Sequence, residues 1–227
     1  GIVPACAHAS YLINLASPDR ALYAKSVTAL VEELRRCDTL ELPELVIHPG
    51  AHMGKGVEWG VKRVAAAVNR GHDRLPDGRC RVCLETTAGA GTTLGSAFEE
   101  LAAIVALVED QRRVSICVDT CHIFAAGYDI GDTKSYRRTI KNLADTLGLR
   151  RVAIFHMNDS RADCGERKDR HQHIGRGKIG LEGFRLIMND RRFANIPKIL
   201  ETPKGPNMAM DVDNIAVLRA LIGVKTP

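Results

Sequence analysis

The chain lacks any long hydrophobic run, and none of its stretches reaches the roughly eighteen consecutive apolar residues of a membrane span. The N-terminus has neither a basic segment nor a long apolar core, so no signal peptide is predicted. Aromatic residues are scarce, at 4% of the sequence. These absences argue against membrane and secreted proteins, and they favour a cytoplasmic protein with no membrane partner.

A large excess of one charge and a thiol-rich metal site are also missing. The net charge of +5 permits a polyanionic partner without requiring one. The seven cysteines lie mostly in apolar runs and are predicted to be reduced core thiols. Cys80 and Cys83 have the spacing of half a zinc ribbon, but no second such pair follows, so packing is the favoured interpretation.

Short apolar runs alternate with stretches of helical periodicity. The expected strands are Gly1–Ala7, Leu45–Ile47, Arg81–Leu84, Val114–Val118, Arg151–Phe155 and Lys198–Leu200. The expected helices are Ala21–Cys37, Val57–Asn69, Leu94–Glu109, Lys134–Leu147, Leu181–Met188 and Asp211–Leu221. In the first of these, one face should carry Leu22, Val27, Leu30, Val31 and Leu34. The alternation predicts an α/β fold with a mainly parallel sheet. Since no linker interrupts it, we expect one domain over residues 1–227.

Each expected strand is followed by a residue that can bind a metal ion. In chain order these residues are His8, His48, Glu85, Asp119, His156 and Glu201. The intervals between them are 40, 37, 34, 37 and 45 residues, which suits one βα unit per step. In a parallel barrel the carboxyl ends of all strands open on one face, so these side chains would converge there. An open sheet would spread them along an edge, so we predict a TIM (β/α)₈ barrel.

Such a barrel needs eight strands, and six are expected here. The chain begins with Gly1 directly on an expected strand. We therefore expect that the first two βα units, on the order of 60 residues, are missing from this chain. An open sheet accounts for six strands without a truncation, but it explains the convergence of metal-binding residues poorly.

Three more candidate ligands lie close to the strand ends. His122 follows Asp119 by one helical turn, while Asp169 and His171 lie in a polar loop after the fifth expected strand. Nitrogen and oxygen ligands without thiolate suit Zn²⁺, and Mn²⁺ or Fe²⁺ less specifically. A single histidine at a strand end is often structural, and Asp119 could be a helix N-cap. All six strand ends are hard to explain in that way.

The nine candidates exceed what one ion needs and suffice for three ions, especially if a carboxylate bridges two of them. Three divalent ions, four carboxylates and one hydroxide would leave a net charge of about +1. Such a site attracts a phosphodiester and can stabilise the charge that develops during its cleavage.

Several motifs carry a family resemblance. They are "HASYLINLA" (8–16), "HPGAH" (48–52), "LETTAGAGTTLG" (84–95), "CVDTCHIFAAGYD" (117–129), "FHMNDS" (155–160), "DRHQHIGRGKIG" (169–180) and "ILET" (199–202). In this order, over nearly the whole chain, they closely resemble the endonuclease IV family of apurinic/apyrimidinic endonucleases. The resemblance implies a trinuclear-zinc TIM barrel that cleaves DNA on the 5′ side of an abasic site. It also implies a 3′-hydroxyl and a 5′-deoxyribose phosphate as products, and the trimming of blocked 3′ ends.

The resemblance also implies a role for each candidate ligand. His8 and His48 would hold the first zinc ion, and Glu85 would bridge it to the second. Asp119, His156 and Glu201 would complete the second, while the third would be held by His122, Asp169 and His171. Mn²⁺ or Fe²⁺ could take one of the sites. Glu85 is the predicted catalytic residue, because it is best suited to orient the nucleophile.

The implied partner is double-stranded DNA that contains abasic sites, bound by a monomer. Tyr11 and Leu12 match the family's wedge positions, which fill the gap left by a flipped nucleotide. Without the family, plain loop packing is an equal alternative. Arg161 stands where the family usually has lysine, and with Arg170 it is predicted to contact DNA phosphates. An idle surface charge is the alternative for each of these two arginines.

Two other functions stay open on the sequence alone. A sugar isomerase or epimerase on the same kind of barrel would use one metal ion, which Glu85, Asp119, His156 and Glu201 could hold. It would have no use for the other candidate ligands. A non-catalytic binder of damaged DNA would have no need to keep all nine candidates.

Overall fold

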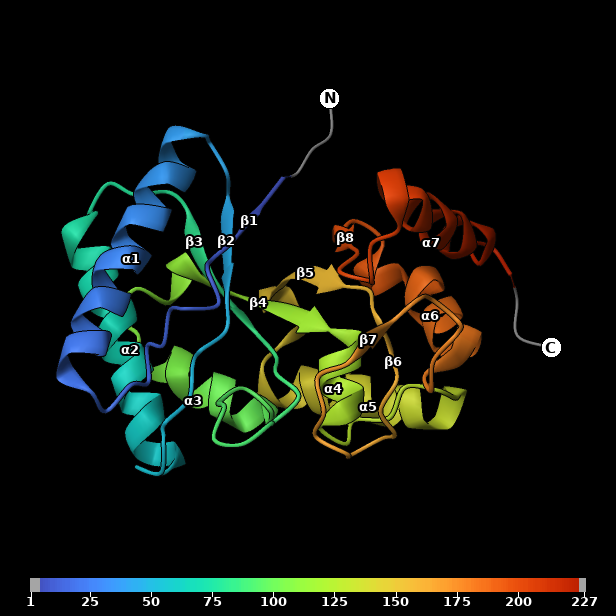
Figure 1. Ribbon diagram of the computed structural model, residues 1–227, viewed down its shortest axis with the longest axis horizontal. Coiled ribbons are helices and arrows are strands. Elements are labelled where there is room, and N and C mark those ends of the chain that lie inside the picture. The colour runs from blue at the N-terminus through green and yellow to red at the C-terminus, as the bar shows by residue number, and fades with distance from the viewer. Residues whose placement is uncertain (1–4, 225–227) are drawn as a thin grey trace. The chain divides into compact units, whose positions relative to one another are not determined.

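The computed structural model describes residues 5–224, and its contacts divide the chain into two compact units. The first unit is Gly1–Cys117 and the second is Val118–Pro227. Figure 1 labels their helices and strands along the chain. The expectation of a single domain stays a prediction.

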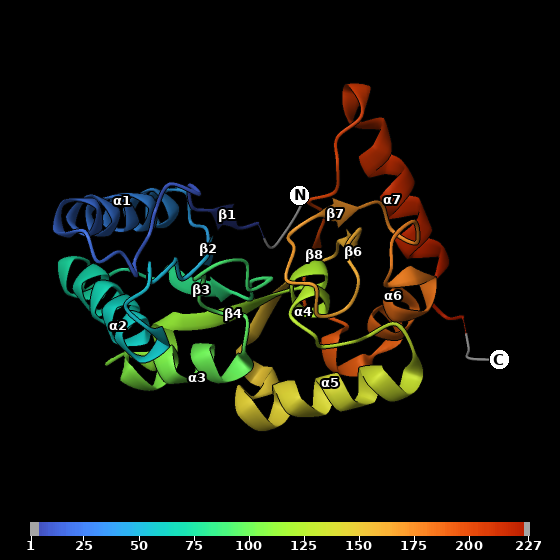
Figure 2. The ribbon, with the colours of Figure 1, turned by 60° about the horizontal axis from the view of Figure 1, so that its bottom comes forward.

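The first unit contains parallel strands that pair in chain order. They are β1 (Ala7–His8), β2 (Glu44–Ile47), β3 (Arg81–Glu85) and β4 (Val114–Asp119), of which the last two residues belong to the second unit. Its helices are α1 (Arg20–Thr39), α2 (Val57–Arg74), α3 (Phe98–Leu107) and the 3₁₀ turn η1 (Gln111–Arg113). Helix α2 packs against both α1 and α3, and the three form a layer beside the strands (Figure 2).

Burial explains why these segments fold as they do. Every residue of β2 and β4 is buried, as expected for parallel strands that are covered on both faces. Helix α1 begins where the Asp19 carboxylate accepts a hydrogen bond from the Leu22 backbone N–H, at 2.7 Å. The expected apolar face of α1 is wrong at Leu22, which is 41% exposed, because the neighbouring Tyr23 occupies the core position one residue later.

The second unit pairs β5 (Val152–His156) with β8 (Lys198–Ile199) in parallel, and β6 (Asp159–Ser160) with β7 (His171–Gln172) in antiparallel orientation. Its helices are α4 (Thr120–Ala125), α5 (Thr133–Thr146), α6 (Gly180–Asn189) and α7 (Ala209–Ala220). Three 3₁₀ turns complete it: η2 (Leu149–Arg151), η3 (Arg191–Phe193) and η4 (Pro206–Met208). Phe155 and Phe193 pack edge to face in its core, with ring centroids 4.9 Å apart.

Most expected elements are found within a few residues of their predicted ends. The first expected strand is an exception: residues 1–4 lie outside the described residues, and from residue 5 onward the strand comprises Ala7–His8. Helix α3 begins at Phe98 and not at Leu94. Helix α4 and the β6–β7 hairpin were not predicted. Among residues 5–224, no helix combines the length and apolarity that crossing a membrane requires.

Candidate metal centre

The residues that were expected at strand ends do lie at carboxyl ends of strands. Four of them are the last residues of β1, β3, β4 and β5: His8, Glu85, Asp119 and His156. His48 directly follows β2, and Glu201 lies two residues beyond β8. Together with His122, Asp169 and His171, these residues form three sets of three side chains, and each set lies within one unit.

The first set, in the first unit, consists of His8, His48 and Glu85. Its centre is one oxygen atom, Oε2 of Glu85, which lies 2.9 Å from Nε2 of His8 and 3.1 Å from Nε2 of His48. The two imidazole rings meet edge to face, with centroids 5.6 Å apart. Glu85 is fully buried, whereas the histidine side chains are 36% and 41% exposed. The set is therefore anchored in the core and open toward solvent on the histidine side.

The hydrogen bonds of His8 indicate which ring nitrogen is available to a ligand. Its Nδ1 lies 2.8 Å from the carbonyl oxygen of Ala9, a contact that favours the tautomer in which Nδ1 donates. In that neutral tautomer Nε2 presents a lone pair toward a carboxylate oxygen of Glu85. Two lone pairs at this distance repel unless a proton or a metal ion lies between them. The set therefore fits a cation.

The second set, in the second unit, consists of Asp119, His156 and Glu201. Nδ1 of His156 lies 3.1 Å from Oε2 of Glu201 and 4.0 Å from Oδ2 of Asp119. Ligand atoms of all three residues lie within 4.8 Å of one another. Asp119 is fully buried and the His156 side chain is 2% exposed. A buried carboxylate of this kind is retained in a fold only when it is paired, hydrogen-bonded or bound to a metal.

The third set, also in the second unit, consists of His122, Asp169 and His171. Asp169 directs one oxygen toward each histidine, at 3.2 Å from Nε2 of His122 and 3.3 Å from Nε2 of His171. The two Nε2 atoms are 3.4 Å apart. Because Nδ1 of His171 donates to the carbonyl oxygen of Glu201 at 3.1 Å, its Nε2 has a lone pair in the neutral ring. His122, Asp169 and His171 thus bring one ligand atom each toward one point, as in a metal site.

Asp119 contributes to both sets of the second unit. Its Oδ1 accepts the backbone N–H of His122 at 2.8 Å and so caps the short helix α4, which carries His122. Its Oδ2 is directed toward His156 and lies 3.7 Å from Nε2 of His171. The sequence alternatives of helix cap and metal ligand are therefore compatible, because each uses a different oxygen.

Sulfur ligands are not favoured beside these sets. Cys121 has its sulfur within 4.8 Å of ligand atoms of Asp119 and His171. Burial raises the pKa of the Cys121 thiol to about 11, which disfavours the thiolate form that binds metal ions. Its Sγ donates instead to the carbonyl oxygen of Arg170, at 3.6 Å. The donor set is one of nitrogen and oxygen, which fits Zn²⁺ and similar ions.

One residue that contacts the second set was missed by the sequence analysis. Asn158, two residues beyond His156, is fully buried and donates from Nδ2 to Oδ2 of Asp119 at 2.6 Å. The available signal was its position directly after a strand that ends on a candidate ligand. That position alone does not distinguish the asparagine from an ordinary loop residue, because loops contain no repeating pattern that marks a buried side chain.

The predicted wedge residues are strongly exposed. Tyr11 is 91% exposed and Leu12 is 68% exposed, which does not suit the alternative of loop packing. Tyr11 and His48 both line a small cavity of about 180 Å³ in the first unit. Asn14 fixes the base of this loop, since its Oδ1 accepts the N–H of Ala51 and its Nδ2 donates to the Ala51 carbonyl. The wedge role stays a prediction.

The two predicted phosphate contacts, Arg161 and Arg170, are exposed and neighbouring. The backbone N–H of Arg161 donates to the carbonyl oxygen of Arg170 at 2.9 Å, where the loop that connects β6 and β7 begins and ends. The side chain of Arg170 donates to the carbonyl oxygen of Asp169 at 2.6 Å. Both arginines lie near the third set, because Arg170 stands between Asp169 and His171 in the sequence and Arg161 is bonded to Arg170. Their contact with DNA stays a prediction.

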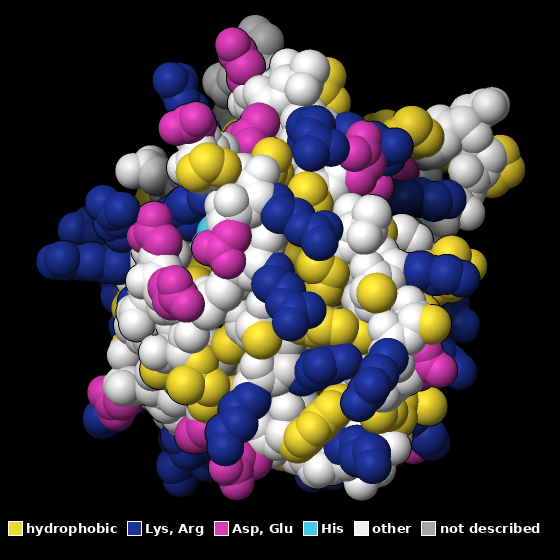
Figure 3. Space-filling view, turned by 90° about the vertical axis from the view of Figure 1, so that its left-hand side faces the viewer, with side chains coloured by type: hydrophobic (Ala, Val, Ile, Leu, Met, Phe, Trp, Pro, Cys, Tyr) yellow, Lys and Arg dark blue, Asp and Glu magenta, His cyan; other side chains and the backbone are white. Residues whose placement is uncertain are grey.

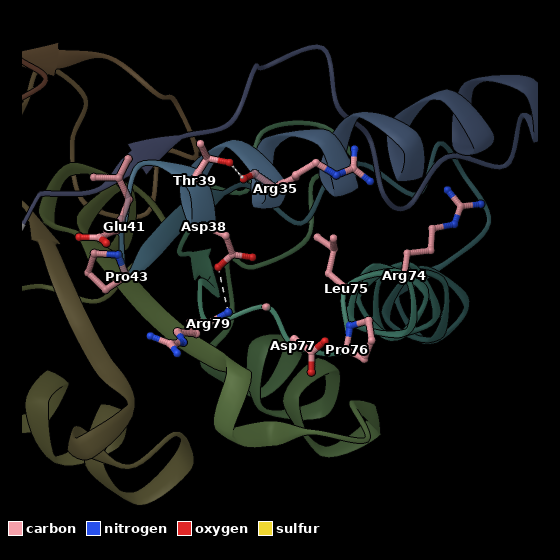
Figure 4. Close-up of a pocket in the computed structure, with 12 residues that line it drawn as sticks. Arg35, Asp38, Thr39, Glu41, Pro43, Arg74, Leu75, Pro76, Asp77 and Arg79 are labelled. Atoms are coloured by element: carbon pink, nitrogen blue, oxygen red, sulfur yellow. Dashed lines mark hydrogen bonds between the residues drawn. The ribbon is translucent and has the colours of Figure 1, made fainter.

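A larger cavity, of about 760 Å³, lies at the opposite end of the strands of the first unit. Figure 4 shows it between the last turns of α1 and α2, where Asp38 accepts the backbone N–H of Arg79. It is lined by loops that lead into the amino ends of β2 and β3, whereas His48 and Glu85 follow or end those strands. Selecting a site by cavity volume alone would therefore lead to a cavity that none of the candidate ligands lines.

The surface charge is mixed and does not by itself indicate a polyanion partner. Figure 3 shows many Lys and Arg side chains on one face, with acidic side chains between and beside them. On α1 and α2 several cations pair within their own helix: Arg35 with Glu32, Arg36 with Glu33, and Lys62 with Glu58. Such exposed pairs neutralise charge locally and add little stability.

Comparison with known proteins identifies close relatives. The family model described as "xylose isomerase-like TIM barrel" matches residues 1–221. The chain is 53% identical over 222 residues to a protein named "probable endonuclease 4" from Chloroflexus aurantiacus, with 98% of this chain and 78% of the relative covered. These matches confirm the predicted TIM-barrel fold class. The expectation of two preceding βα units stays a prediction.

Solved structures agree with this result. The crystal structure of endonuclease IV from Thermus thermophilus matches with a TM-score of 0.83 and 38% identity, covering 96% of this chain and 76% of that chain. A D-tagatose 3-epimerase-like protein matches with a TM-score of 0.73 at 18% identity, covering 95% of this chain and 76% of that chain. At that identity the second match reflects the barrel fold alone.

Proposed function

This chain belongs to the endonuclease IV proteins of the xylose isomerase-like TIM barrel family, as the sequence resemblance predicted, and from that premise we propose that it is a zinc-dependent endonuclease of DNA repair. It cleaves the phosphodiester bond on the 5′ side of an abasic site, leaves a 3′-hydroxyl and a 5′-deoxyribose phosphate, and trims blocked 3′ ends. It binds double-stranded DNA as a monomer. It holds three zinc ions per chain, one of which Mn²⁺ or Fe²⁺ can replace.

The observation that carries this proposal is the third set. A sugar isomerase or epimerase would need one ion, held by Glu85, Asp119, His156 and Glu201. It would have no use for Asp169 placed between the two histidines His122 and His171, at 3.2 Å and 3.3 Å. The third set therefore supports a reaction in which several metal ions stabilise the developing negative charge, as in the cleavage of a phosphodiester.

The protein's own residues prepare the site for this reaction. Zinc held by the three sets would activate a water molecule as the nucleophile at neutral pH and would bring positive charge to the phosphate oxygens. Glu85, fully buried, accepts a hydrogen bond from the nucleophile and aims it at phosphorus. The carbonyl oxygens of Ala9 and Glu201 favour the tautomers of His8 and His171 in which Nδ1 donates and Nε2 presents a lone pair to a metal ion. Because these contacts exist before substrate arrives, little reorganisation is needed during the reaction.

DNA is held by residues around the three sets. Tyr11 and Leu12, exposed on the loop after β1, fill the gap that a flipped abasic nucleotide leaves in the stack. Arg161 and Arg170 contact phosphates near the third set. Arginine in place of the usual lysine keeps the charge and adds the ability to bind two phosphate oxygens at once.

The experiment that tests the function combines incision with metal analysis. A duplex with one defined abasic site is incubated with the chain as purified, after chelation, and after zinc is restored, and zinc is counted in each sample. Incision that is lost and restored with about three zinc ions per chain supports the proposal. About one ion per chain with epimerisation of a ketose would favour the isomerase. Three ions with binding but no incision would favour a DNA-damage binder.

Replacement of Glu85 by Gln tests the catalytic assignment. The change keeps the size of the side chain but removes the charge that faces two imidazole nitrogens, so incision should fall by about 100-fold or more. The control is Glu58→Gln, an exposed residue of α2 whose charge pairs with Lys62 on the same helix, and it should keep full activity. Circular dichroism should show the same fold in both variants. Full incision by Glu85→Gln would contradict the assignment.

A further inference from the structure

We propose that Asn158 is a positioning residue that sets the geometry of the second set by holding Asp119 and Glu201 from two sides. The inference rests on the proposed function, since it assigns a role beside the metal ligands of that function. Nδ2 of Asn158 donates to Oδ2 of Asp119 at 2.6 Å. Its Oδ1 accepts the backbone N–H of Glu201 at 2.8 Å. One amide group thus joins the carboxyl end of β4 to the segment that follows β8.

Asn158 is itself held in a single orientation. Its side chain is fully buried, and its backbone N–H donates to Oγ1 of Thr120 at 2.9 Å. The Thr120 hydroxyl donates in turn to the carbonyl oxygen of Asn158, at 2.7 Å. Because both the backbone and the side chain are bound, the amide cannot turn without breaking buried hydrogen bonds. A residue fixed in this way can fix its neighbours.

The effect on Asp119 is specific. Since Oδ1 of Asp119 already caps helix α4, the bond from Asn158 to Oδ2 removes the remaining freedom of the carboxylate to rotate. Oδ2 retains a lone pair, and it lies 4.0 Å from Nδ1 of His156. The carboxylate therefore offers one oxygen in one direction. Residues that hydrogen-bond to metal ligands in this manner tune the affinity of the site.

At this position an amide can both donate a hydrogen bond to Asp119 and accept one from the N–H of Glu201. An aspartate would still accept the N–H of Glu201, but it would place a second carboxylate against the buried Asp119. An alanine would leave both the carboxylate and the N–H without their partner. The alternative is that Asn158 only stabilises the fold, and the chain offers a matched control for it.

That control is Asn189, on helix α6 of the same unit. Its half-buried amide also makes hydrogen bonds in both directions, donating to the carbonyl oxygens of Arg185 and Leu221 and accepting the N–H of Gly223. None of these partners is a candidate ligand. Removal of Asn189 should therefore lower stability without any change in metal binding.

The experiment compares Asn158→Ala, Asn158→Asp and Asn189→Ala in the full chain. Zinc affinity is measured by competition with a chromogenic chelator, and stability by thermal unfolding. The two Asn158 variants should bind one zinc ion per chain about 10 to 100 times more weakly than the wild type. Asn189→Ala should unfold at a lower temperature but keep wild-type affinity at every site. Where folded variants incise abasic DNA, the Asn158 changes should lower kcat and leave KM unchanged.

The outcomes separate this inference from the proposed function. Wild-type zinc affinity in either folded Asn158 variant would overturn the positioning role, even if the wild type incises abasic DNA. A wild type that binds zinc but does not incise would overturn the function, while the zinc measurement would still decide the role of Asn158. If Asn158→Ala fails to fold, Asn158→Asp decides, because it keeps the size of the side chain and one of its two bonds.

Discussion

His72 is a buried histidine on α2 that the proposed reaction does not use. The residue is 7% exposed, and within the described part of the chain neither ring nitrogen has a hydrogen-bond partner. Burial, and next the nearby positive charge of Arg113, lower the pKa of His72 from 6.5 to about 4. The folded chain therefore holds this ring neutral at a pH where the unfolded chain would protonate it.

The sign of the resulting pH dependence follows from the lowered pKa. Above pH 6.5, His72 is neutral in both the folded and the unfolded chain, and the free energy of unfolding has its full value. As the pH falls from 6.5 toward 4, the unfolded chain binds a proton that the folded chain does not, so the free energy of unfolding decreases. His72→Leu should remove this loss. Between pH 7.5 and 4.5 the wild type should lose about 2 to 3 kcal/mol more unfolding free energy than the variant. Urea unfolding of chelator-treated samples measures this, and parallel pH curves would contradict it.

At the scale of single residues, the sequence identified candidate ligands but not their supports. Glu85 and Asp119 could be predicted because each follows a recognisable strand. Asn158 could not, because its role depends on Asp119 and Glu201, which lie far away in sequence and are brought together only by the fold. The division of Asp119 and His122 between two sets came from the family resemblance, since spacing alone would have joined them.

At the scale of the element, α2 contains two interior glycines with opposite environments. A Cβ atom on Gly71 would lie 3.4 Å from Leu30 and 3.5 Å from Leu34, which are ordinary contacts. A Cβ atom on Gly60 would lie 2.8 Å from Leu94 and 2.9 Å from His52, which is too close. The same change at the two positions should therefore have opposite effects.

Gly71→Ala should stabilise the chain by about 0.5 to 1 kcal/mol, because alanine favours the helix and fills available space. Gly60→Ala should destabilise it by about 1 to 3 kcal/mol, because the helix or its neighbours must shift. Denaturant unfolding of both variants beside the wild type measures the gap. Equal effects at the two positions would show that α2 does not pack as described.

Element boundaries were predictable where hydrophobic periodicity extends to the end of the element. Helix α1 was expected at Ala21–Cys37 and is found at Arg20–Thr39. Helix α3 begins later than its periodicity suggests, because Glu100 binds the backbone N–H groups of Gly95 and Ser96 and so holds that turn outside the helix. Helix α4 has six residues and each strand of the β6–β7 hairpin has two, which is too short for any period to appear.

At the scale of the whole molecule, the candidate ligands divide between the two compact units. The first set lies within Gly1–Cys117, while the second and third sets lie within Val118–Pro227. The TIM-barrel fold was predictable from the repetition of strand-end ligands along the chain, because repetition is visible without any knowledge of contacts. The division into two units was not, since no linker or change in composition marks residue 117.

This division makes the effect of metal removal testable for each unit. Metal-free carboxylates such as Glu85 and Asp119 are fully buried, so bound zinc should stabilise the folded chain. At a free zinc concentration about 100 times the dissociation constant, one site contributes about 2.7 kcal/mol, which for a chain of this size raises the melting temperature by about 5 to 10 °C. Calorimetry of chelated and zinc-restored samples measures this change, with Mg²⁺ as a control that should not restore it.

Two variants then assign the effect to its unit. His8→Ala removes a ligand of the first set, and His171→Ala removes a ligand of the third set. Each variant should bind about one zinc ion fewer than the wild type and should retain part of the zinc-dependent rise in melting temperature, because the other unit keeps its ligands intact. If chelation leaves the melting temperature of the wild type unchanged, the buried carboxylates are stable without metal, and the acceptor groups described above must be held together by shared protons instead.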